Sequence, residues 1–262
     1  MVFSPTAEEH KKLQQLKTAL QEHLLTNRST NPKIRDELKK IAVNPDFLFK
    51  YLRGRKLNVN RALENILYYA EVKWVIYPEY FSPQVPDYVR YAIECKLLSM
   101  LSKKDELGRT YIYVDSTKYD DSQISAEKCA NGFRYIVENL MDSPDFLDNG
   151  LIVLLSGKGI QMKHCKNASN EAKFYMKFWR GFPGKLKAFI YFDAPFVARA
   201  LSSIVKPLIT SKVVDRAYTS SGMGDLHKRV SLDILPASLG GKLGEEEAIL
   251  PTDKLMALAY GK

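Results

Sequence analysis

The chain lacks any long apolar segment. A transmembrane helix needs about 18 or more mostly apolar residues in a row, and no uncharged run of that length occurs among the 262 residues. The opening residues, MVFSPTAEEHKKLQQL, contain no apolar core of the length found in secretory signal peptides. We therefore expect a soluble, cytoplasmic protein.

Cysteine is also scarce. The three cysteines, Cys95, Cys129 and Cys165, are odd in number, far apart and outside any CxxC pair. This pattern argues against a disulfide framework and against a structural zinc site, so we expect a reducing compartment and no metal. The four histidines are likewise dispersed, and only His164 has a cysteine beside it.

Signatures of common catalytic sites are missing as well. The stretch YTSSGMG lacks the first glycine that a GxSxG nucleophile elbow requires, and neither HExxH nor a P-loop occurs. SGKG (156–159) follows an apolar run as a phosphate-binding turn would, but it lacks the P-loop spacing. We therefore expect a protein that is not an enzyme and has no cofactor.

Acidic residues are fewer than basic ones, with 30 Asp and Glu against 39 Lys and Arg, which gives a net charge of +9. Two zones carry much of the excess: residues 1–61 contain 13 basic and 6 acidic residues, and residues 185–229 contain 8 and 3. Such a surface favours anionic partners, either nucleic acid or an acidic membrane leaflet. Because no known nucleic-acid-binding module accompanies the charge, we expect no nucleic-acid partner.

The first 80 residues have helical periodicity. Thr6 and Glu9 have the spacing of a capping box, and leucines then recur every three or four residues from Leu13 to Leu24. Three more helices are predicted to begin after Asn31, Asn44 and Asn58. These segments predict a helical bundle over residues 1–80, which ends at the proline-rich stretch YPEYFSPQVP.

Beyond residue 80 the pattern changes to short apolar runs rich in β-branched and aromatic residues, as in buried strands. They are TYIYVD (110–115), LIVLLS (151–156) and KAFIYFD (187–193), and helical stretches over 126–141 and 170–180 separate them. Alternating strands and helices predict an α/β domain over residues 81–262 with a mainly parallel sheet.

An amphipathic segment, DAPFVARALSSIVKPLIT (193–210), follows the third strand directly. Its apolar residues share one face at three- and four-residue spacing, while Arg199 and Lys206 fall on the other. Pro207 has no amide hydrogen to donate, so we expect the helix to kink there. The spacing alone is compatible with a hinged lid and with a plain core helix.

Three stretches resemble the CRAL-TRIO lipid-transfer family. FLFKYLRGRKLNVNRAL (47–63) is similar to the family's N-terminal helical motif. GFPGKLKAFIYFDAPFVARALSSIVKPLITSKVVDRAY (181–218) and LHKRVSLDILPASLGGKLG (226–244) resemble the second half of its lipid-binding domain, with the FP, DAP, KP, LP and GG landmarks in order. LLSGKGIQMKH (154–164) departs from the family's more frequent Asp-Leu-x-Gly, which bears on the pocket and leaves the expected fold intact.

The resemblance implies an all-helical N-terminal bundle and an α/β domain whose sheet floors a hydrophobic pocket, closed by a gate helix at residues 193–210. The implied cargo is one hydrophobic lipid of the tocopherol, retinoid or carotenoid type. From alternation and family positions, the predicted pocket residues are Val114, Phe133, Ile136, Leu140, Leu151, Val153, Leu155, Phe174, Phe178, Phe189, Tyr191, Ala198, Leu201, Val205 and Ile209. Each of them alone is also what an ordinary core would contain.

Four basic residues flank the predicted gate. Lys185 and Lys187 lie two apart beside a strand and should point to one side, and Lys212 and Arg216 lie four apart and should share a helical face. All four match the phosphoinositide-binding cleft of the tocopherol-transfer branch of the family, which implies an acidic membrane surface as a partner. The plain alternative is a solvated charged surface.

Phospholipid exchange is the alternative function. In the phosphatidylinositol-transfer branch, the headgroup is held by basic residues that match Arg55 and Lys56 and by a Glu–Lys pair near the gate. Arg216 stands at the lysine position, but Gly184 replaces the glutamate, which weakens this alternative. We expect Arg55 and Lys56 to lie at the bundle interface, and we expect a monomer that meets membranes transiently.

Overall fold

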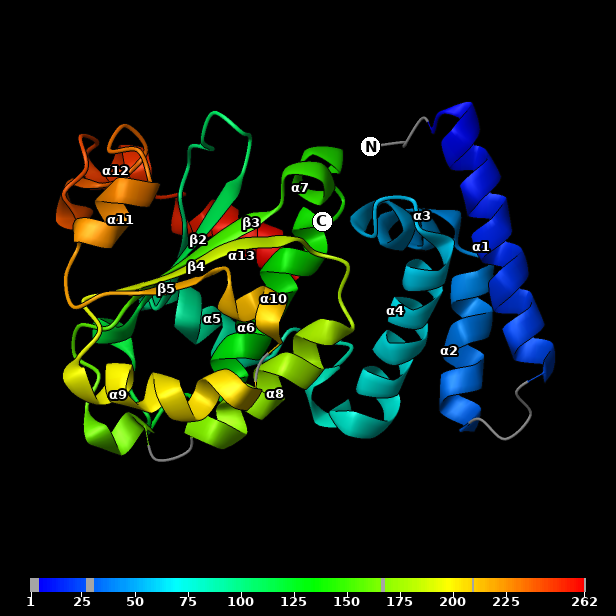
Figure 1. The fold of residues 1–262 in the computed structure, drawn as a ribbon, viewed down its shortest axis with the longest axis horizontal. Coiled ribbons are helices and arrows are strands. Elements are labelled where there is room, and N and C mark those ends of the chain that lie inside the picture. The colour runs from blue at the N-terminus through cyan, green and yellow to red at the C-terminus, as the bar shows by residue number, and fades with distance from the viewer. Residues whose placement is uncertain (1–4, 27–30, 166–167, 209, 262) are drawn as a thin grey trace. The chain divides into compact units, whose positions relative to one another are not determined.

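A computed structural model describes residues 5–26, 31–165, 168–208 and 210–261, apart from the side chains of residues 201–205. Contacts between residues divide the chain into two compact units (Figure 1). The helical unit comprises residues 1–83, 141–148 and 177–185, and the α/β unit comprises residues 84–140, 149–176 and 186–262. Within the described ranges, no helix is both long and apolar enough to cross a membrane.

The regular elements in the described residues of the first unit are all helical. They are α1 (Ala7–Thr26), α2 (Pro32–Ala42), α3 (Pro45–Gly54), α4 (Val59–Glu71), the π-helical turn η1 (Val72–Ile76), the 3-10 turn η2 (Pro78–Tyr80), most of α7 (Pro144–Asn149) and the end of α8 (Ala168–Arg180). Thr6 and Glu9 form the two hydrogen bonds of the predicted capping box. Asparagine side chains cap α2, α3 and α4 at the predicted positions, which are Asn31, Asn44 and Asn58.

The core of the helical unit combines aliphatic and aromatic side chains. Leu16 and Leu20 of α1 are fully buried, as the predicted inward face of this helix requires. Tyr69 of α4 packs against four other rings, which belong to Phe47, Tyr51, Phe81 and Phe182. Tilted and edge-on ring pairs of this kind stabilise a core beyond the area that they bury.

Four consecutive carbonyl groups, those of residues 180–183, accept hydrogen bonds from side chains of the helical unit. The donors are Asn65 to residue 180 at 2.6 Å, Tyr51 to residue 181 at 3.0 Å, and Arg55 to residues 182 and 183 at 2.8 Å and 3.3 Å. Burial lowers the pKa of Arg55. These bonds explain why residues 177–185 belong to the helical unit, whereas the predicted boundary after residue 80 assigns them to the other domain.

The α/β unit is organised around a five-stranded sheet whose order in space follows the chain. The strands are β1 (Leu98–Met100), β2 (Thr110–Asp115), β3 (Leu151–Ser156), β4 (Leu186–Phe192) and β5 (Ala217–Thr219). β1 is antiparallel to β2, and the other neighbours are parallel, so the predicted mainly parallel sheet is confirmed. β2 and β3 have the predicted bounds, and β4 begins and ends one residue earlier than predicted.

Helices lie on both sides of this sheet (Figure 1). The longer ones are α5 (Asp87–Glu94), α6 (Ala126–Leu140), α8 (Ala168–Arg180), α9 (Phe196–Val205) and α13 (Thr252–Tyr260). The shorter elements are η3 (Ser116–Lys118), η4 (Met162–Cys165), η5 (Lys206–Leu208), α10 (Ser211–Val214), α11 (Gly224–Arg229), η6 (Ala237–Leu239) and α12 (Glu245–Ala248). Pro207 acts as predicted, because α9 ends two residues before it and continues as the 3-10 turn η5.

The first face of the sheet forms one hydrophobic core of the α/β unit. Its strand residues are Tyr111, Ile152, Leu154, Ala188, Ile190 and Phe192, and all of them are buried. They pack against apolar side chains from the C-terminal part of the chain, including Leu226 of α11 and Leu239 of η6. The chain itself therefore covers most of this face, and Tyr113 and Tyr218 at its two sides are partly buried.

The second face of the sheet is less completely covered. Cross-strand register pairs Val114 with Leu155 and Leu155 with Tyr191, so these three side chains form one row. All three are half-buried, whereas Leu154 and Ile190, which point to the first face, are 0% and 1% exposed. Apolar side chains in a parallel sheet are normally covered on both faces, so this row is available to a further covering group.

Two adjacent leucines of β3, one on each face, test whether the first face is more deeply buried than the second. Leu154→Ala should lower the free energy of unfolding by about 2–5 kcal/mol, because it empties a fully buried site. Leu155→Ala should cost about half as much or less, because part of this side chain is already exposed. Urea unfolding followed by circular dichroism measures both values, and equal losses would contradict the difference in packing.

Gly54 tests the close approach of α3 to residues 180–183. A β-carbon at this position would lie 2.5 Å from the carbonyl oxygen of Pro183 and 2.6 Å from its β-carbon. Gly54→Ala should therefore destabilise the protein by about 1–3 kcal/mol through overpacking, although alanine otherwise favours a helix.

The matched control is Gly244→Ala, because no atom lies within 4 Å of a β-carbon added there. This change should alter stability by less than about 1 kcal/mol. Thermal denaturation of both variants provides the comparison. A Gly54→Ala melting temperature as high as that of the control would show that the backbone contact is not restrictive.

Candidate functional site: an apolar sheet face

All six predicted strand residues of the pocket lie on the second face. They are Val114, Leu151, Val153, Leu155, Phe189 and Tyr191. Exposure increases along β3, from 5% at Leu151 and 8% at Val153 to a half-buried Leu155. The least covered part of the face is therefore at the carboxyl ends of the strands, where α/β proteins commonly bind ligands.

Tyr191 gives this apolar row a polar end. Burial raises the pKa of its hydroxyl to about 12, with a smaller contribution from the Cys165 thiol. The hydroxyl therefore stays neutral at physiological pH and can donate a hydrogen bond to a polar group of a ligand. The proximity of Cys165 also places the end of η4 near the carboxyl end of β4.

α6 lies on the second face and brings further predicted residues to it. They are Phe133 and Ile136, which are buried, and Leu140, which is half-buried. A β-carbon added at Gly132 would lie 3.2 Å from Cδ1 of Leu98, and Leu98 pairs with Val114. Because cross-strand partners point to the same face, α6 covers the second face near β1.

The two predicted phenylalanines of α8 have different surroundings. Phe174 belongs to the α/β unit and is buried, with its ring 5.9 Å from that of Tyr175. Phe178 belongs to the helical unit, where its ring is fully buried against those of Tyr77, Tyr80, Phe81 and Phe182. The structure therefore places Phe178 in the core of the helical unit, and its contribution to the aromatic wall of the pocket stays a prediction.

α9 corresponds to the predicted gate helix and packs against η4. Of its predicted pocket residues, Ala198 is half-buried. The side chains of Leu201 and Val205, and the whole of Ile209, lie outside the described residues. The structure therefore describes the course of α9 and leaves most of its predicted pocket contacts as predictions.

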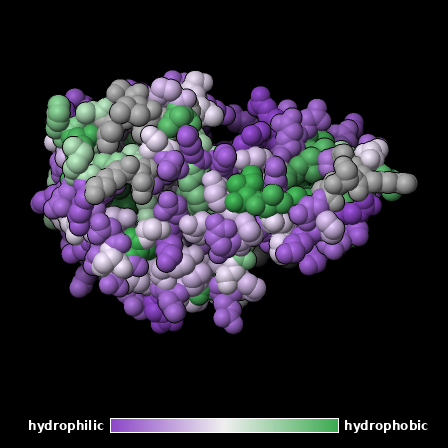
Figure 2. All heavy atoms as spheres, turned by 90° about the horizontal axis from the view of Figure 1, so that it is seen from below, coloured by the Kyte–Doolittle hydropathy of each residue, from purple (hydrophilic) through white to green (hydrophobic). Residues whose placement is uncertain are grey.

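Two exposed apolar side chains lie on α9 and on the turn that it contacts. Phe196 of α9 is 77% exposed, and Met162 of η4 is 65% exposed. The guanidinium of Arg199, one turn after Phe196, lies 6.0 Å from the centre of the phenylalanine ring. Seen from the side of α8 and α9, apolar surface occurs as separate patches among polar side chains (Figure 2).

The four predicted basic residues are divided between the units. Lys185 belongs to the helical unit, and Lys187, Lys212 and Arg216 belong to the α/β unit. Arg216 donates from Nη1 to the carbonyl of Leu186 at 2.5 Å, so its guanidinium lies at the first residue of β4. Lys187 follows directly in the strand and, like Lys212, is exposed.

Lys212 and Arg216 do not share a helical face as predicted. α10 ends at Val214, and Arg216 lies in the turn that follows it. The helix stops because the chain enters the sheet here: the carbonyl of Arg216 accepts the Phe189 N–H at 2.9 Å, which begins the pairing of β4 with β5. Four-residue spacing alone does not reveal so short a helix.

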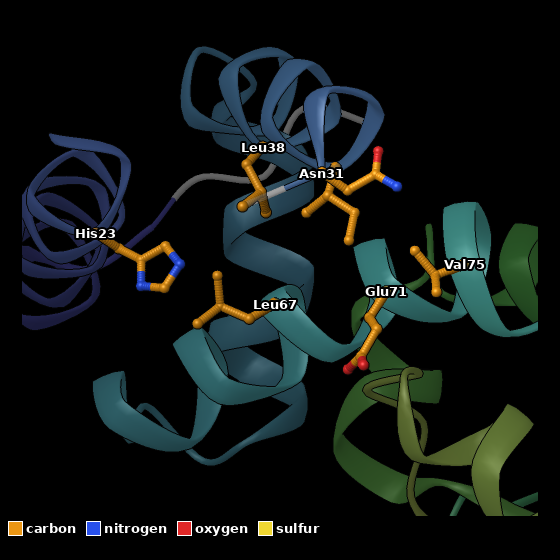
Figure 3. Close-up of a pocket in the computed structure, with 7 residues that line it drawn as sticks. His23, Asn31, Leu38, Leu67, Glu71 and Val75 are labelled. Carbon is orange, nitrogen blue, oxygen red and sulfur yellow. The ribbon is translucent and has the colours of Figure 1, made fainter. Parts of the chain in front are cut away.

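Two surface grooves lie apart from the predicted pocket residues. The larger has a volume of about 310 Å³ and lies in the helical unit, where His23 points toward the space between Leu38 and Leu67 (Figure 3). The smaller, about 250 Å³, is lined by Arg90, Met256, Ala257 and Tyr260. Helix packing produces such shallow grooves, and no sequence motif marks either of them.

Reactive groups are few in the described part of the chain. There, no three His, Cys, Asp or Glu side chains come together in a way that could hold a metal ion. The three cysteines are free thiols, and burial raises the pKa of Cys129 to about 12 and also raises that of Cys165. These two thiols therefore remain protonated, which makes them poor nucleophiles and poor metal ligands.

Two further residues of the second face escaped the sequence prediction. Ile112 precedes Val114 by two residues in β2, so alternation alone could have identified it. Leu98 contributes through β1, whose three residues are too few to give a periodic signal. Both extend the apolar face toward the edge of the sheet.

The sequence profile of the CRAL/TRIO domain matches residues 96–241. A human protein named alpha-tocopherol transfer protein-like is 25% identical over 222 residues, which cover 81% of this chain and 63% of that protein. Clavesin-1 from Xenopus laevis is 21% identical over 201 residues, which cover 75% and 60%. The chain thus spans less than two thirds of the length of these curated relatives.

A solved structure supports the fold independently of close sequence similarity. The crystal structure of Sfh5 matches 87% of this chain and 85% of its own chain with a TM-score of 0.53, at 13% sequence identity. Likeness at this identity supports the architecture alone, and the profile match over more than half of the sequence supplies the relationship. The chain therefore belongs to the CRAL/TRIO domain family of lipid-binding and lipid-transfer proteins.

Proposed function

We propose that this protein carries one hydrophobic lipid of the tocopherol, retinoid or carotenoid type in an internal pocket and transfers it between membranes. The observation that carries the proposal is the second face of the sheet, where an apolar row loses its cover toward the carboxyl ends of the strands. A relative whose name includes alpha-tocopherol transfer adds support for this class of cargo.

The physical basis of the proposal is the removal of apolar surface from water. Each Å² of apolar surface that a ligand and its pocket bury together contributes roughly 25 cal/mol. A lipid in contact with Val114, Leu155 and Tyr191 would bury the apolar surface that these side chains leave exposed on the second face. The neutral Tyr191 hydroxyl could bind a hydroxyl or carbonyl group of the cargo, because phenolic oxygens both donate and accept hydrogen bonds.

α9 serves as the gate in this proposal. When it is closed, its apolar face covers the lipid, and when it is open, the same face can meet the bilayer. The exposed side chains of Phe196 and Met162 suit a first contact with lipid, because aromatic and thioether groups partition well into the membrane interface. The protein would then be cytoplasmic and would touch membranes transiently.

Lys187, Lys212 and Arg216 are proposed to bind anionic headgroups, with Lys185 close by in the sequence. Arg216 is held at the start of β4 by its bond to Leu186, and the two lysines are exposed. Each cation near an acidic leaflet contributes about 1 kcal/mol. Phosphoinositides, which carry several negative charges, are the proposed partner on the membrane.

The experiment that tests the cargo is native purification followed by ultraviolet-visible spectroscopy and mass spectrometry of the extracted lipids. A stoichiometric isoprenoid is the expected result, and its absorption separates a carotenoid from a tocopherol or retinoid. Stoichiometric phospholipid would replace the proposed cargo and favour phospholipid exchange. A protein that neither retains nor takes up any of these lipids, even when offered them directly, would contradict the carrier proposal.

A bulky substitution on the second face should block the pocket. Leu155→Trp is expected to lower the affinity for the lipid roughly fivefold to 150-fold, because overpacking costs about 1–3 kcal/mol and each 1.4 kcal/mol is a factor of ten in affinity. Leu107→Trp makes the same change at an exposed position of the α/β unit. Titration of a fluorescent lipid analogue into both variants measures the effect, and equal affinities would place the cargo elsewhere.

Removal of the three cations proposed to bind headgroups should slow delivery of the lipid to membranes without weakening binding of the lipid to the protein. The variant with Lys187, Lys212 and Arg216 changed to alanine is expected to deliver lipid to phosphoinositide liposomes about a hundredfold more slowly, because about 1 kcal/mol per cation, or about 3 kcal/mol in all, is lost. Affinity for the cargo in solution should stay nearly unchanged. The measurement is transfer of a fluorescent lipid between liposomes with and without phosphoinositide.

The matched control removes three lysines that form surface ion pairs with Glu247, Asp225 and Asp233. They are Lys103, Lys228 and Lys242. This control lowers the net charge by the same amount, so it reports any long-range effect of charge. If both triple variants deliver lipid equally well, the three proposed cations are an ordinary charged surface.

A further inference from the structure

The turn η4, which packs against α9, is closed by a histidine side chain. The N–H of Gln161 donates to Nδ1 of His164 at 3.1 Å, and the N–H of His164 donates to the carbonyl of Gln161 at 3.0 Å. Because Nδ1 accepts a hydrogen bond, the ring proton must lie on Nε2. Only the neutral imidazole can make this contact.

The imidazole of His164 is enclosed and faces titratable groups from several elements. Its side chain is 10% exposed, and Nε2 lies 3.9 Å from Oδ2 of Asp121. Asp121 also pairs with Lys163 at 3.3 Å. The ring of Tyr119 meets the imidazole edge-on, with the ring centres 5.5 Å apart.

Two further carboxyl groups lie in the same region. Glu171 of α8 interacts with Cys165 of η4 and with Tyr119, and Glu127 of α6 interacts with Glu171. Burial, with a contribution from Glu127, raises the pKa of Glu171 to about 6. Glu171 is therefore charged at neutral pH and becomes neutral in mildly acidic solution.

The elements around this turn carry further charged groups: the carboxylate of Asp120, which interacts with Lys163, and two cations on and after the helix that η4 contacts. Arg199 of α9 and Lys206 of η5 are both exposed to solvent. They repel added positive charge weakly, because exposed charges are screened by water and salt. The response of η4 to pH therefore depends mainly on His164 and on the groups that enclose it.

We propose that His164 is a pH-sensitive latch, and that protonation of its imidazole opens η4 and releases α9. This inference rests on the proposed function of α9 as the gate. An imidazolium carries hydrogen on both ring nitrogens, so Nδ1 can no longer accept the Gln161 N–H, and two donors face each other. Asp121 attracts the imidazolium, but it is partly exposed and already paired with Lys163, so this attraction is weak.

The latch would couple release of the cargo to arrival at a membrane. Anionic leaflets attract protons as they attract other cations, so the pH at their surface is lower than in bulk solution. Histidine is the side chain whose charge ordinarily changes between about pH 5 and 8. The anionic membrane surface that attracts Lys187, Lys212 and Arg216 would therefore also favour protonation of His164 and so the release of α9.

Amide hydrogen exchange measured by NMR on the full chain tests the latch directly. The amides of Gln161 and α9 are compared at about pH 7.5 and pH 5.5, which span the histidine range, after correction for the pH dependence of the chemical exchange rate. In the wild-type protein, protection of these amides should fall roughly fivefold or more at the lower pH, as local opening becomes easier.

Three variants separate the latch from general effects of acid. His164→Asn keeps an acceptor oxygen in the place of Nδ1 and cannot titrate, so protection should be high at both pH values. His164→Phe removes the acceptor, so protection should be low at both. His10→Asn removes an exposed histidine of α1 and should behave as the wild-type protein. Circular dichroism verifies that each variant is folded.

Unchanged protection of wild-type Gln161 at the two pH values would overturn the latch, and so would a pH response in His164→Asn as large as that of the wild-type protein. Retention of bound α-tocopherol is measured in parallel, because it depends on the gate as well as on the latch. Amide exchange that responds to pH, together with constant tocopherol retention, would support the latch and contradict the gate role of α9.

Discussion

A parallel sheet has apolar side chains on both faces, and each face must be covered. This constraint governs the α/β unit. The C-terminal part of the chain covers the first face around Leu154 and Ile190, although Tyr113 and Tyr218 on the same face are only partly buried. On the second face, α6 covers the region near β1, and cover decreases toward Leu155 and Tyr191. The least covered part of the second face lies at the carboxyl ends of β3 and β4, and η4 and α9 follow these strands in the chain. The proposed carrier function depends on both features.

The helical unit depends on a different requirement: buried backbone carbonyl groups need hydrogen-bond donors. Asn65, Tyr51 and Arg55 supply them to residues 180–183, and Gly54 leaves space for the approach. Arg55 is therefore occupied within this unit and contributes to its stability. A segment that is distant in sequence thus becomes part of the bundle.

Local chemistry made much of the fold predictable from the sequence. Asparagine caps, the Thr6–Glu9 capping box and Pro207 act within one or two helical turns, and the structure confirms all of them. The six predicted strand residues share one sheet face, as their alternation along the strands implies. Features set by distant contacts were not predictable: the aromatic partners of Phe178, the carbonyl donors to residues 180–183 and the early end of α10 all depend on tertiary structure. The lipid contacts of the second face remain predictions.

The order of the strands has a mechanical consequence for α9. The chain leaves β4 at Phe192, forms α9, η5 and α10, and returns as β5, which pairs with β4 through Phe189 and Ala217. Both ends of this connection are therefore fastened to neighbouring strands of one sheet. At the first end, Asp193 has a φ of 48°, a left-handed conformation that turns the chain sharply out of the strand. The connection that contains α9 is thus fastened at both ends to the sheet, so the opening proposed for α9 would require no strand pairing to break.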